Sequence, residues 1–136
     1  MPGSDSAGGV GGKSRLVTTS TATAFTAKIA LTHPAVGPGT YQINWCYGWN
    51  HNSTGNDFLC QIVNGGGINY VNHIAEPADS GGAGPGGTNQ RYYSGGFFDV
   101  VYGVATADTF TMQFATSVAG VSSAIFDARL EFIRVA

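Results

Sequence analysis

The side chains in this 136-residue sequence that could do chemistry are two cysteines, three histidines and eight carboxylates. Five of these residues are candidate metal ligands: His51, Asp57, His73, Glu76 and Asp79. No two histidines stand at a spacing that zinc sites use, and residues 76–82 lack the alternating oxygen ligands of a calcium loop. We therefore interpret these residues as solvated loop side chains, and we expect no metal and no other cofactor.

Nucleophilic catalysis needs an activated serine or cysteine beside a base and a group that orients the base. The Ser-Gly-Gly sequences at 80–82 and 94–96 do not match the nucleophile elbow of hydrolases. Cys46 lies in a strand pattern, and we expect it in the core. We find no catalytic constellation and expect that the chain is not an enzyme. Asn52-Ser53-Thr54 fits a glycosylation sequon, which has meaning only in a secreted eukaryotic protein.

The two cysteines, Cys46 and Cys60, allow two interpretations. If residues 41–50 and 57–63 formed a simple hairpin, these cysteines would lie opposite each other and could form a disulfide. The N-terminus shows no basic start followed by an apolar block, so we expect no signal peptide. We therefore favour two reduced, buried thiols.

The elements that must position these side chains are β-strands. Between Gly39 and Val63 the pattern is clearest, because Tyr41, Ile43, Trp45, Tyr47 and Trp49 alternate with smaller or polar residues. Turn residues separate runs of this kind about every ten residues, and no stretch has helical periodicity. We predict about eight antiparallel strands, near 15–20, 23–32, 41–50, 57–63, 68–74, 89–102, 108–117 and 122–135. This spacing favours an all-β sandwich of jelly-roll type.

The predicted core contains the largest apolar residues of these alternating patterns: Ile43, Trp45, Tyr47, Phe110, Phe114, Leu130 and Phe132. In the last strand we expect Phe126 and Ala128 to point to the same side as Leu130. Residues 1–14 have too little apolar surface to fold alone and read as a flexible Gly/Ser-rich arm. The β-domain then covers residues 15–136, and residues 76–88 form a long surface loop.

Charge and hydropathy exclude two classes of partner. The net charge is -2 and the six basic residues are scattered along the chain, so we expect no nucleic-acid partner. No apolar run approaches the length of a membrane span, and we expect no membrane partner. Only 10% of the residues are charged, well below the usual fraction of about 25%. This scarcity suggests that part of the surface is covered by partners.

Several sequence blocks together resemble the small β-sandwich capsid decoration (cement) proteins and related head-surface proteins of tailed bacteriophages. The blocks are GTYQINWCYGW, STGNDF, EPADS, NQR followed by SGGFFDV, and ARLEFIRV. The last block is also similar to the final strand of trimeric jelly rolls of the tumour-necrosis-factor and C1q type. The resemblance implies a homotrimer on the outer surface of a virion, made in the host cytoplasm and bound to the major capsid protein. Fold likeness alone does not transfer function.

Three sets of contact residues follow as expectations. Val10, Lys13 and Arg15 are the candidate capsid contacts of the arm. The charged stripe on the outward side of the last strand is a candidate subunit contact: Asp127, Arg129 and Glu131. Trp49, next to a turn, is the candidate for stacking on a sugar ring. It belongs to the alternative function, a fibre-tip or head-fibre module that binds host surface carbohydrate.

Overall fold

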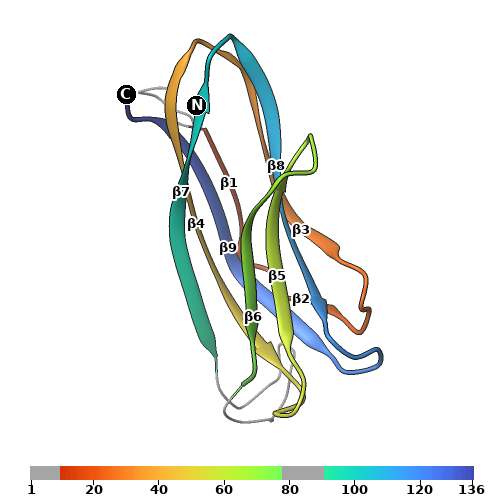
Figure 1. Ribbon diagram of the computed structural model, residues 1–136. Helices are drawn as coiled ribbons and strands as arrows, with labels where there is room; N and C mark the ends of the chain where they lie inside the picture. Colours follow the sequence, from red (N-terminus) through yellow and green to blue (C-terminus); the bar gives the residue numbers. More distant parts are fainter. Residues whose placement is uncertain (1–9, 78–90) are drawn as a thin grey trace.

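The computed structural model describes residues 10–77 and 91–136, and the described chain is built of strands and turns (Figure 1). Nine strands follow one another: β1 (Val10–Ser14), β2 (Thr18–Ser20), β3 (Thr26–Val36), β4 (Gly39–His51), β5 (Phe58–Asn64), β6 (Asn69–Ala75), β7 (Tyr92–Tyr102), β8 (Thr106–Thr116) and β9 (Ser123–Arg134). These ranges contain no helix long and apolar enough to cross a membrane.

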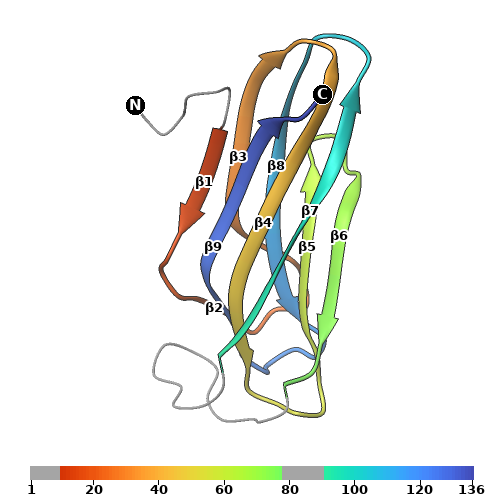
Figure 2. The same cartoon turned by 90° about the vertical axis from the view of Figure 1, so that its left-hand side faces the viewer.

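The strands form two antiparallel sheets that pack face to face (Figure 2). Sheet A has the order β1-β9-β4-β7, with β2 also paired to β9, and sheet B has the order β3-β8-β5-β6. The pairs β2/β9, β3/β8, β4/β7 and β5/β6 are nested, as if one long hairpin had been rolled up. This is the jelly-roll connection, and it confirms the predicted all-β sandwich.

One strand, β1, was not predicted, and it lies where the sequence predicted a flexible arm. β1 pairs with β9 from Val10↔Phe132 to Ser14↔Ala128, so the domain begins at or before Val10 and not at residue 15. Glycine makes this possible, because a Cβ atom at Gly12 would lie 2.9 Å from the carbonyl oxygen of Ala30. The glycine pair therefore lets β1 pack closely against β3. Residues 1–9 of the predicted arm lie outside the described residues.

The core is the interior of the sandwich, as predicted. The predicted residues Ile43, Tyr47, Phe110, Phe114, Leu130 and Phe132 are all buried. Trp45 is only partly buried, and its indole N–H has no hydrogen-bond partner. Gly95 and Gly96 give a close approach to Trp45 and not a bulge, because β7 pairs with β4 without a shift in register.

The hairpin interpretation of the cysteines is wrong. β4 and β5 lie in different sheets, so Cys46 and Cys60 do not face each other across a strand pair. Both are free thiols, one partly buried and one buried. Of the predicted loop over 76–88, only Glu76 and Pro77 belong to the described residues.

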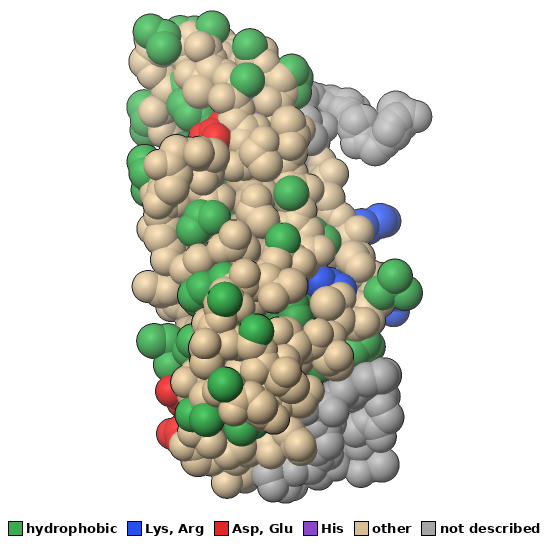
Figure 3. Space-filling view, turned by 90° about the vertical axis from the view of Figure 1, so that its right-hand side faces the viewer, with side chains coloured by type: hydrophobic (Ala, Val, Ile, Leu, Met, Phe, Trp, Pro, Cys, Tyr) green, Lys and Arg blue, Asp and Glu red, His purple; other side chains and the backbone are tan. Residues whose placement is uncertain are grey.

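The two outer faces differ in charge. The surface over sheet B is largely uncharged, with only a few red and blue side chains among tan and green atoms (Figure 3). Its cross-strand neighbours are residues such as Thr32 and Thr109, or Gln61 and Gln113, which bond to each other through their side chains. The outer face of sheet A, by contrast, carries the charged residues Lys13, Arg129 and Glu131.

Candidate functional site

A bulge in β9 shapes the outer face of sheet A. The pairing with β4 shifts between Cys46↔Arg129 and Gly48↔Phe126, so β9 has one extra residue at this point. Asp127 absorbs the irregularity with a positive φ of 48°. An extra residue reverses the alternation of side chains along a strand. Phe126 therefore lies on the outer face over Gly48, and the prediction that it points inward with Leu130 is wrong.

Phe126 is nevertheless buried, because its neighbours cover it. The ring of Tyr93 meets it edge-on, with centroids 6.0 Å apart and planes at 86°. The guanidinium of Arg91 lies 5.0 Å from its centroid. Gly48 provides the space below, since a Cβ atom there would lie 2.3 Å from the Phe126 ring. These contacts hold Tyr93 in place as an exposed wall on the sheet.

The bulge also divides the edge of the sheet. β1 pairs with residues 128–132 of β9, and β2 pairs with residues 123–125, so the chain between them passes the bulge unpaired. Arg15 lies in this passage and forms an ion pair with Asp127, at 3.5 Å between Nε and Oδ1. The hydroxyl of Tyr93 lies 3.5 Å from the other carboxylate oxygen of Asp127. Asp127 thus lies between Arg15 of the β1–β2 connection and Tyr93 of β7.

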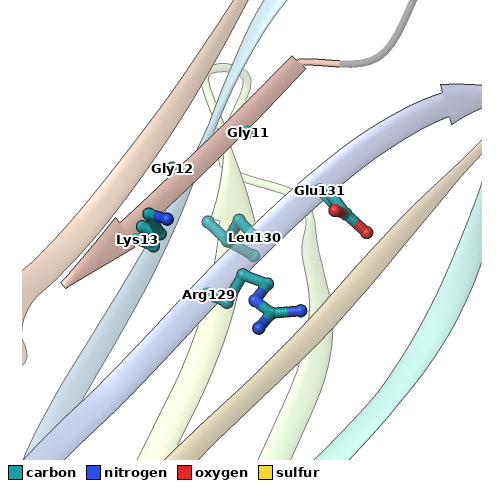
Figure 4. Close-up of a pocket in the computed structure, with 6 residues that line it drawn as sticks. All are labelled: Gly11, Gly12, Lys13, Arg129, Leu130 and Glu131. Atoms are coloured by element: carbon teal, nitrogen blue, oxygen red, sulfur yellow. The ribbon is translucent and has the colours of Figure 1, made fainter. Parts of the chain in front are cut away.

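The strand register brings the two predicted contact sets together. Lys13 lies directly opposite Arg129, and Gly11 lies opposite Glu131. Figure 4 shows these residues on the adjacent strands β1 and β9. The predicted arm residues and the predicted last-strand residues therefore form one surface. The sequence reading treated them as two separate contacts, because nothing local in the sequence indicates that the two chain ends are neighbours.

This surface is hollowed into a groove of two adjoining parts. One part, about 260 Å³, is lined by Gly11, Gly12, Lys13, Arg129, Leu130 and Glu131. The other, about 580 Å³, is lined by Lys13, Ser14, Arg15, Cys46, Tyr93, Asp127, Ala128 and Arg129. The surface is hollow here because Cys46 and Ala128 are small, whereas Tyr93 and Arg129 have long side chains. We call the combined hollow the β1–β9 groove.

The β1–β9 groove concentrates positive charge. The larger part is lined by three basic side chains and one carboxylate, in a chain whose net charge is -2. Between the described residues the one ion pair within 4.0 Å is Arg15–Asp127. Lys13 and Arg129 are like charges at a directly opposed position, which destabilises a strand pair. An anionic group placed between them would relieve this repulsion, so the groove is suited to a carboxylate or another anion.

Trp49 is not available for ligand stacking. It is 4% exposed and lies between Phe58 and Tyr92, with ring centroids at 4.8 Å and 4.6 Å. The exposed aromatic residues on sheet A are instead Tyr93 and Phe97, on the outward side of β7. The alternation in β7 could have indicated them, because Tyr93 and Phe97 are four residues apart and therefore point to the same side of the strand.

The candidate metal ligands are dispersed. His51 is buried and forms hydrogen bonds with the Thr116 hydroxyl and the carbonyl of Ser53. His73, which lies in β6, forms a hydrogen bond with Tyr47. The interpretation of these histidines as solvated loop residues is therefore wrong. Asp79 lies outside the described residues. Residues 10–77 and 91–136 contain no group of three or more histidine, cysteine or acidic residues that could hold a metal ion.

A small polar cluster lies inside the sandwich at Tyr47, Cys60 and His73. The hydroxyl of Tyr47 and Nδ1 of His73 form a hydrogen bond. Burial raises the pKa of the Cys60 thiol to about 12 and raises the pKa of the Tyr47 hydroxyl, whereas it lowers the pKa of His73. A thiol that stays protonated is a poor nucleophile. The cluster therefore has the properties of a satisfied interior network.

Comparison with known proteins adds little to this geometry. No protein-family model matches the sequence, and no curated protein is significantly similar to it. Among solved structures, the chain is similar to part of the insecticidal delta-endotoxin Cry8Ea1 from Bacillus thuringiensis, with 19% sequence identity and a TM-score of 0.49. The match covers 88% of this chain and 20% of the toxin chain. At this level of similarity, we draw no conclusion about function from it.

Proposed function

We propose that this chain is a capsid decoration subunit of a tailed bacteriophage, which binds the outer surface of the head through the β1–β9 groove and stabilises the shell. The observation that carries the proposal is the convergence of Lys13, Arg15 and Arg129 on one hollowed face. Arg15 is paired with Asp127, whereas Lys13 and Arg129 have no ion pair within 4.0 Å among the described residues, and these two charges suit an acidic patch on the major capsid protein. Complementary charge of this kind guides association and fixes the orientation of docking.

The framework of the site supports a binding role. Apart from Arg15, the residues that line the groove lie on strands, so their side chains are held by the sandwich. The largely uncharged surface of sheet B is consistent with contacts between subunits in an assembly. We propose that the subunits form a homotrimer in the virion, as the last-strand resemblance implies. Three grooves in one particle would bind a capsid with higher avidity than one.

A second function is favoured by one observation. Tyr93 is 62% exposed and lines the groove beside Asp127 and the basic residues. An exposed aromatic ring beside hydrogen-bonding groups can hold a sugar ring. The alternative is therefore a head-fibre or fibre-tip module that binds host surface carbohydrate, with Tyr93 in the role that the sequence analysis gave to Trp49.

The test is co-sedimentation with undecorated capsids of the phage that encodes the chain. Arg129→Glu is compared with Arg134→Glu, a matched charge reversal at the far end of β9 that does not line the groove. We expect loss of capsid binding only for Arg129→Glu. Equal binding by both variants, together with glycan binding that Tyr93→Ala abolishes, would replace the proposal with the carbohydrate alternative.

A further inference from the structure

β7 forms the open edge of sheet A. It is 11 residues long and pairs with β4 at every position from Gly39↔Tyr102 to Trp49↔Tyr92. Among the described strands, β4 is its one hydrogen-bonded neighbour, and both ribbon views show β7 at the border of its sheet (Figures 1 and 2). An edge strand presents a row of backbone N–H and C=O groups that another strand can pair with.

β7 has few of the usual protections of an edge strand. Its sequence, YYSGGFFDVVY, contains no lysine and no proline, and Asp99 is its one charged residue. The pairing with β4 has no bulge that would twist the edge away. Soluble proteins normally blunt a long edge with such devices. An edge of this length with a single charge is expected to be covered in the assembled protein.

The outward side of β7 carries a regular apolar stripe. Tyr93, Phe97 and Val101 are 62%, 63% and 75% exposed. These three residues are evenly spaced, four positions apart, with Phe97 at the centre. The stripe therefore has a large apolar residue at the same three places when the strand is read in either direction. A pattern that is symmetric under reversal of the chain is what an isologous contact requires, since each patch must be complementary to itself.

We propose that β7 pairs antiparallel with β7 of a second copy, about a two-fold axis that passes beside Phe97. In this register Phe97 faces Phe97 of the second copy, and Tyr93 faces Val101 of the second copy. Asp99 faces Gly95 of the second copy. Every apolar residue of the stripe then has an apolar cross-strand partner, and such pairs stabilise a sheet.

Neighbouring registers are less favourable for stated reasons. A two-fold axis beside Asp99 would place two carboxylates directly opposite each other, which destabilises the pair. An axis beside Gly95 would place two glycines at the centre and leave Val101 without a partner. The register centred on Phe97 avoids both problems. Two features of β7, its apolar stripe and the position of its one charge, therefore favour the same register between the two copies.

The pairing has a functional consequence that goes beyond capsid binding by one subunit. It joins two copies of sheet A into one continuous sheet, and it places both β1–β9 grooves on the same side. Two grooves on one rigid surface bind a repetitive partner with a high effective concentration for the second contact. In a shell of trimers, the same two-fold contact would join neighbouring trimers.

Sedimentation velocity at high protein concentration tests the contact. Phe97→Lys places like charges opposite each other across the axis, whereas Ile74→Lys is a matched change at a residue that is 64% exposed on β6 of the other sheet. We expect Phe97→Lys to halve the mass of the wild-type particle and Ile74→Lys to leave it unchanged. Equal masses for the wild type and Phe97→Lys would overturn the proposal, and so would dissociation by Ile74→Lys alone.

Cross-linking tests the register, independently of any capsid. In a Cys46→Ser background, single cysteines are introduced as Phe97→Cys and Val101→Cys, two outward positions on the same strand whose substitution leaves Asp99 in place. Mild oxidation should link Phe97→Cys into a disulfide-bonded dimer, because its partner is the same residue across the axis. Val101→Cys should not link, because its two copies lie offset along the strand. Efficient linking of Val101→Cys, or none by Phe97→Cys, would contradict the register.

Discussion

Lys13 of β1 lies directly opposite Arg129 of β9 on the outer face of sheet A. Two like charges at one cross-strand position reduce stability by roughly 0.2–1 kcal/mol. The fold keeps this pair at a cost in stability, and the binding role that we propose for the face would account for it. This relationship between the two ends of the chain is the physical basis of the function we propose.

The first prediction concerns the stability effect of this pair. Lys13→Gln should raise the free energy of unfolding by a few tenths to about 1 kcal/mol at low salt, and the gain should shrink as salt screens the charges. Urea denaturation at two salt concentrations measures it. Lys28→Gln is the control and should lower stability, because the Lys28 ammonium donates to the Leu16 carbonyl at 2.6 Å and to the Thr18 hydroxyl at 2.8 Å. A destabilised Lys13→Gln variant would show that the repulsion does not exist.

The second prediction concerns the support of the groove wall. Gly48→Ala should destabilise the protein by about 1–3 kcal/mol, because the new methyl group would overlap the rings of Phe126 and Tyr93. It should also change the fluorescence or chemical shifts of Tyr93. Gly103→Ala is the matched control, since a Cβ atom at Gly103 meets nothing within 4 Å. If both variants melt at the same temperature, the packing around the bulge is not as described.

The third prediction concerns acid stability. Burial lowers the pKa of His73 below its ordinary value of 6.5. As pH falls below about 6.5, the unfolded chain takes up a proton that the folded protein resists, so stability falls. Tyr47 and Cys60, which face His73, have raised pKa values and do not titrate in this range.

Thermal melts between neutral and mildly acidic pH test this dependence. His73→Gln should show a weaker fall in melting temperature than the wild type. His33 and His51 are present in both proteins, so their contribution is the same in each. Parallel curves for the two proteins would mean that His73 is not the group responsible.

The fourth prediction concerns the N-terminal segment. Deletion of residues 2–9 should leave circular dichroism and melting temperature unchanged, because it keeps the described strand β1, Val10–Ser14, and its pairing with β9. Deletion of residues 2–12 should destabilise the domain, because it removes the pairing of β1 with Phe132, Glu131 and Leu130. If residues 2–9 help to hold the capsid, the shorter deletion should weaken co-sedimentation with capsids. Full capsid occupancy would assign the attachment to the β-domain alone.

Much of the fold could be predicted from alternation alone. The strands around Ile43, Phe110 and Leu130 have one strongly apolar side each, and the structure buries that side. The strand at Gly11 and Gly12 could not be predicted in this way, because its glycines give no alternation. It forms because β9, from the other end of the chain, supplies its hydrogen-bonding partner.

The site was predictable in its residues but not in its arrangement. Lys13, Arg15, Asp127 and Arg129 were each candidates, yet their meeting depends on the register of two distant strands. The bulge at Asp127 had no sequence signal, since the positive φ falls on an aspartate and not on a glycine. Trp49 looked exposed beside a turn, but Phe58 and Tyr92 cover it. Tertiary neighbours decided each of these cases.

The most direct test of the proposed function is a reconstruction of the virion of the phage to which the proposal assigns this chain. We predict jelly-roll density on the outside of the head, with the β1–β9 groove turned toward the major capsid protein and Lys13 and Arg129 next to acidic side chains. Particles that lack the chain on the head, or that carry it only at the tip of a fibre, would contradict the proposal.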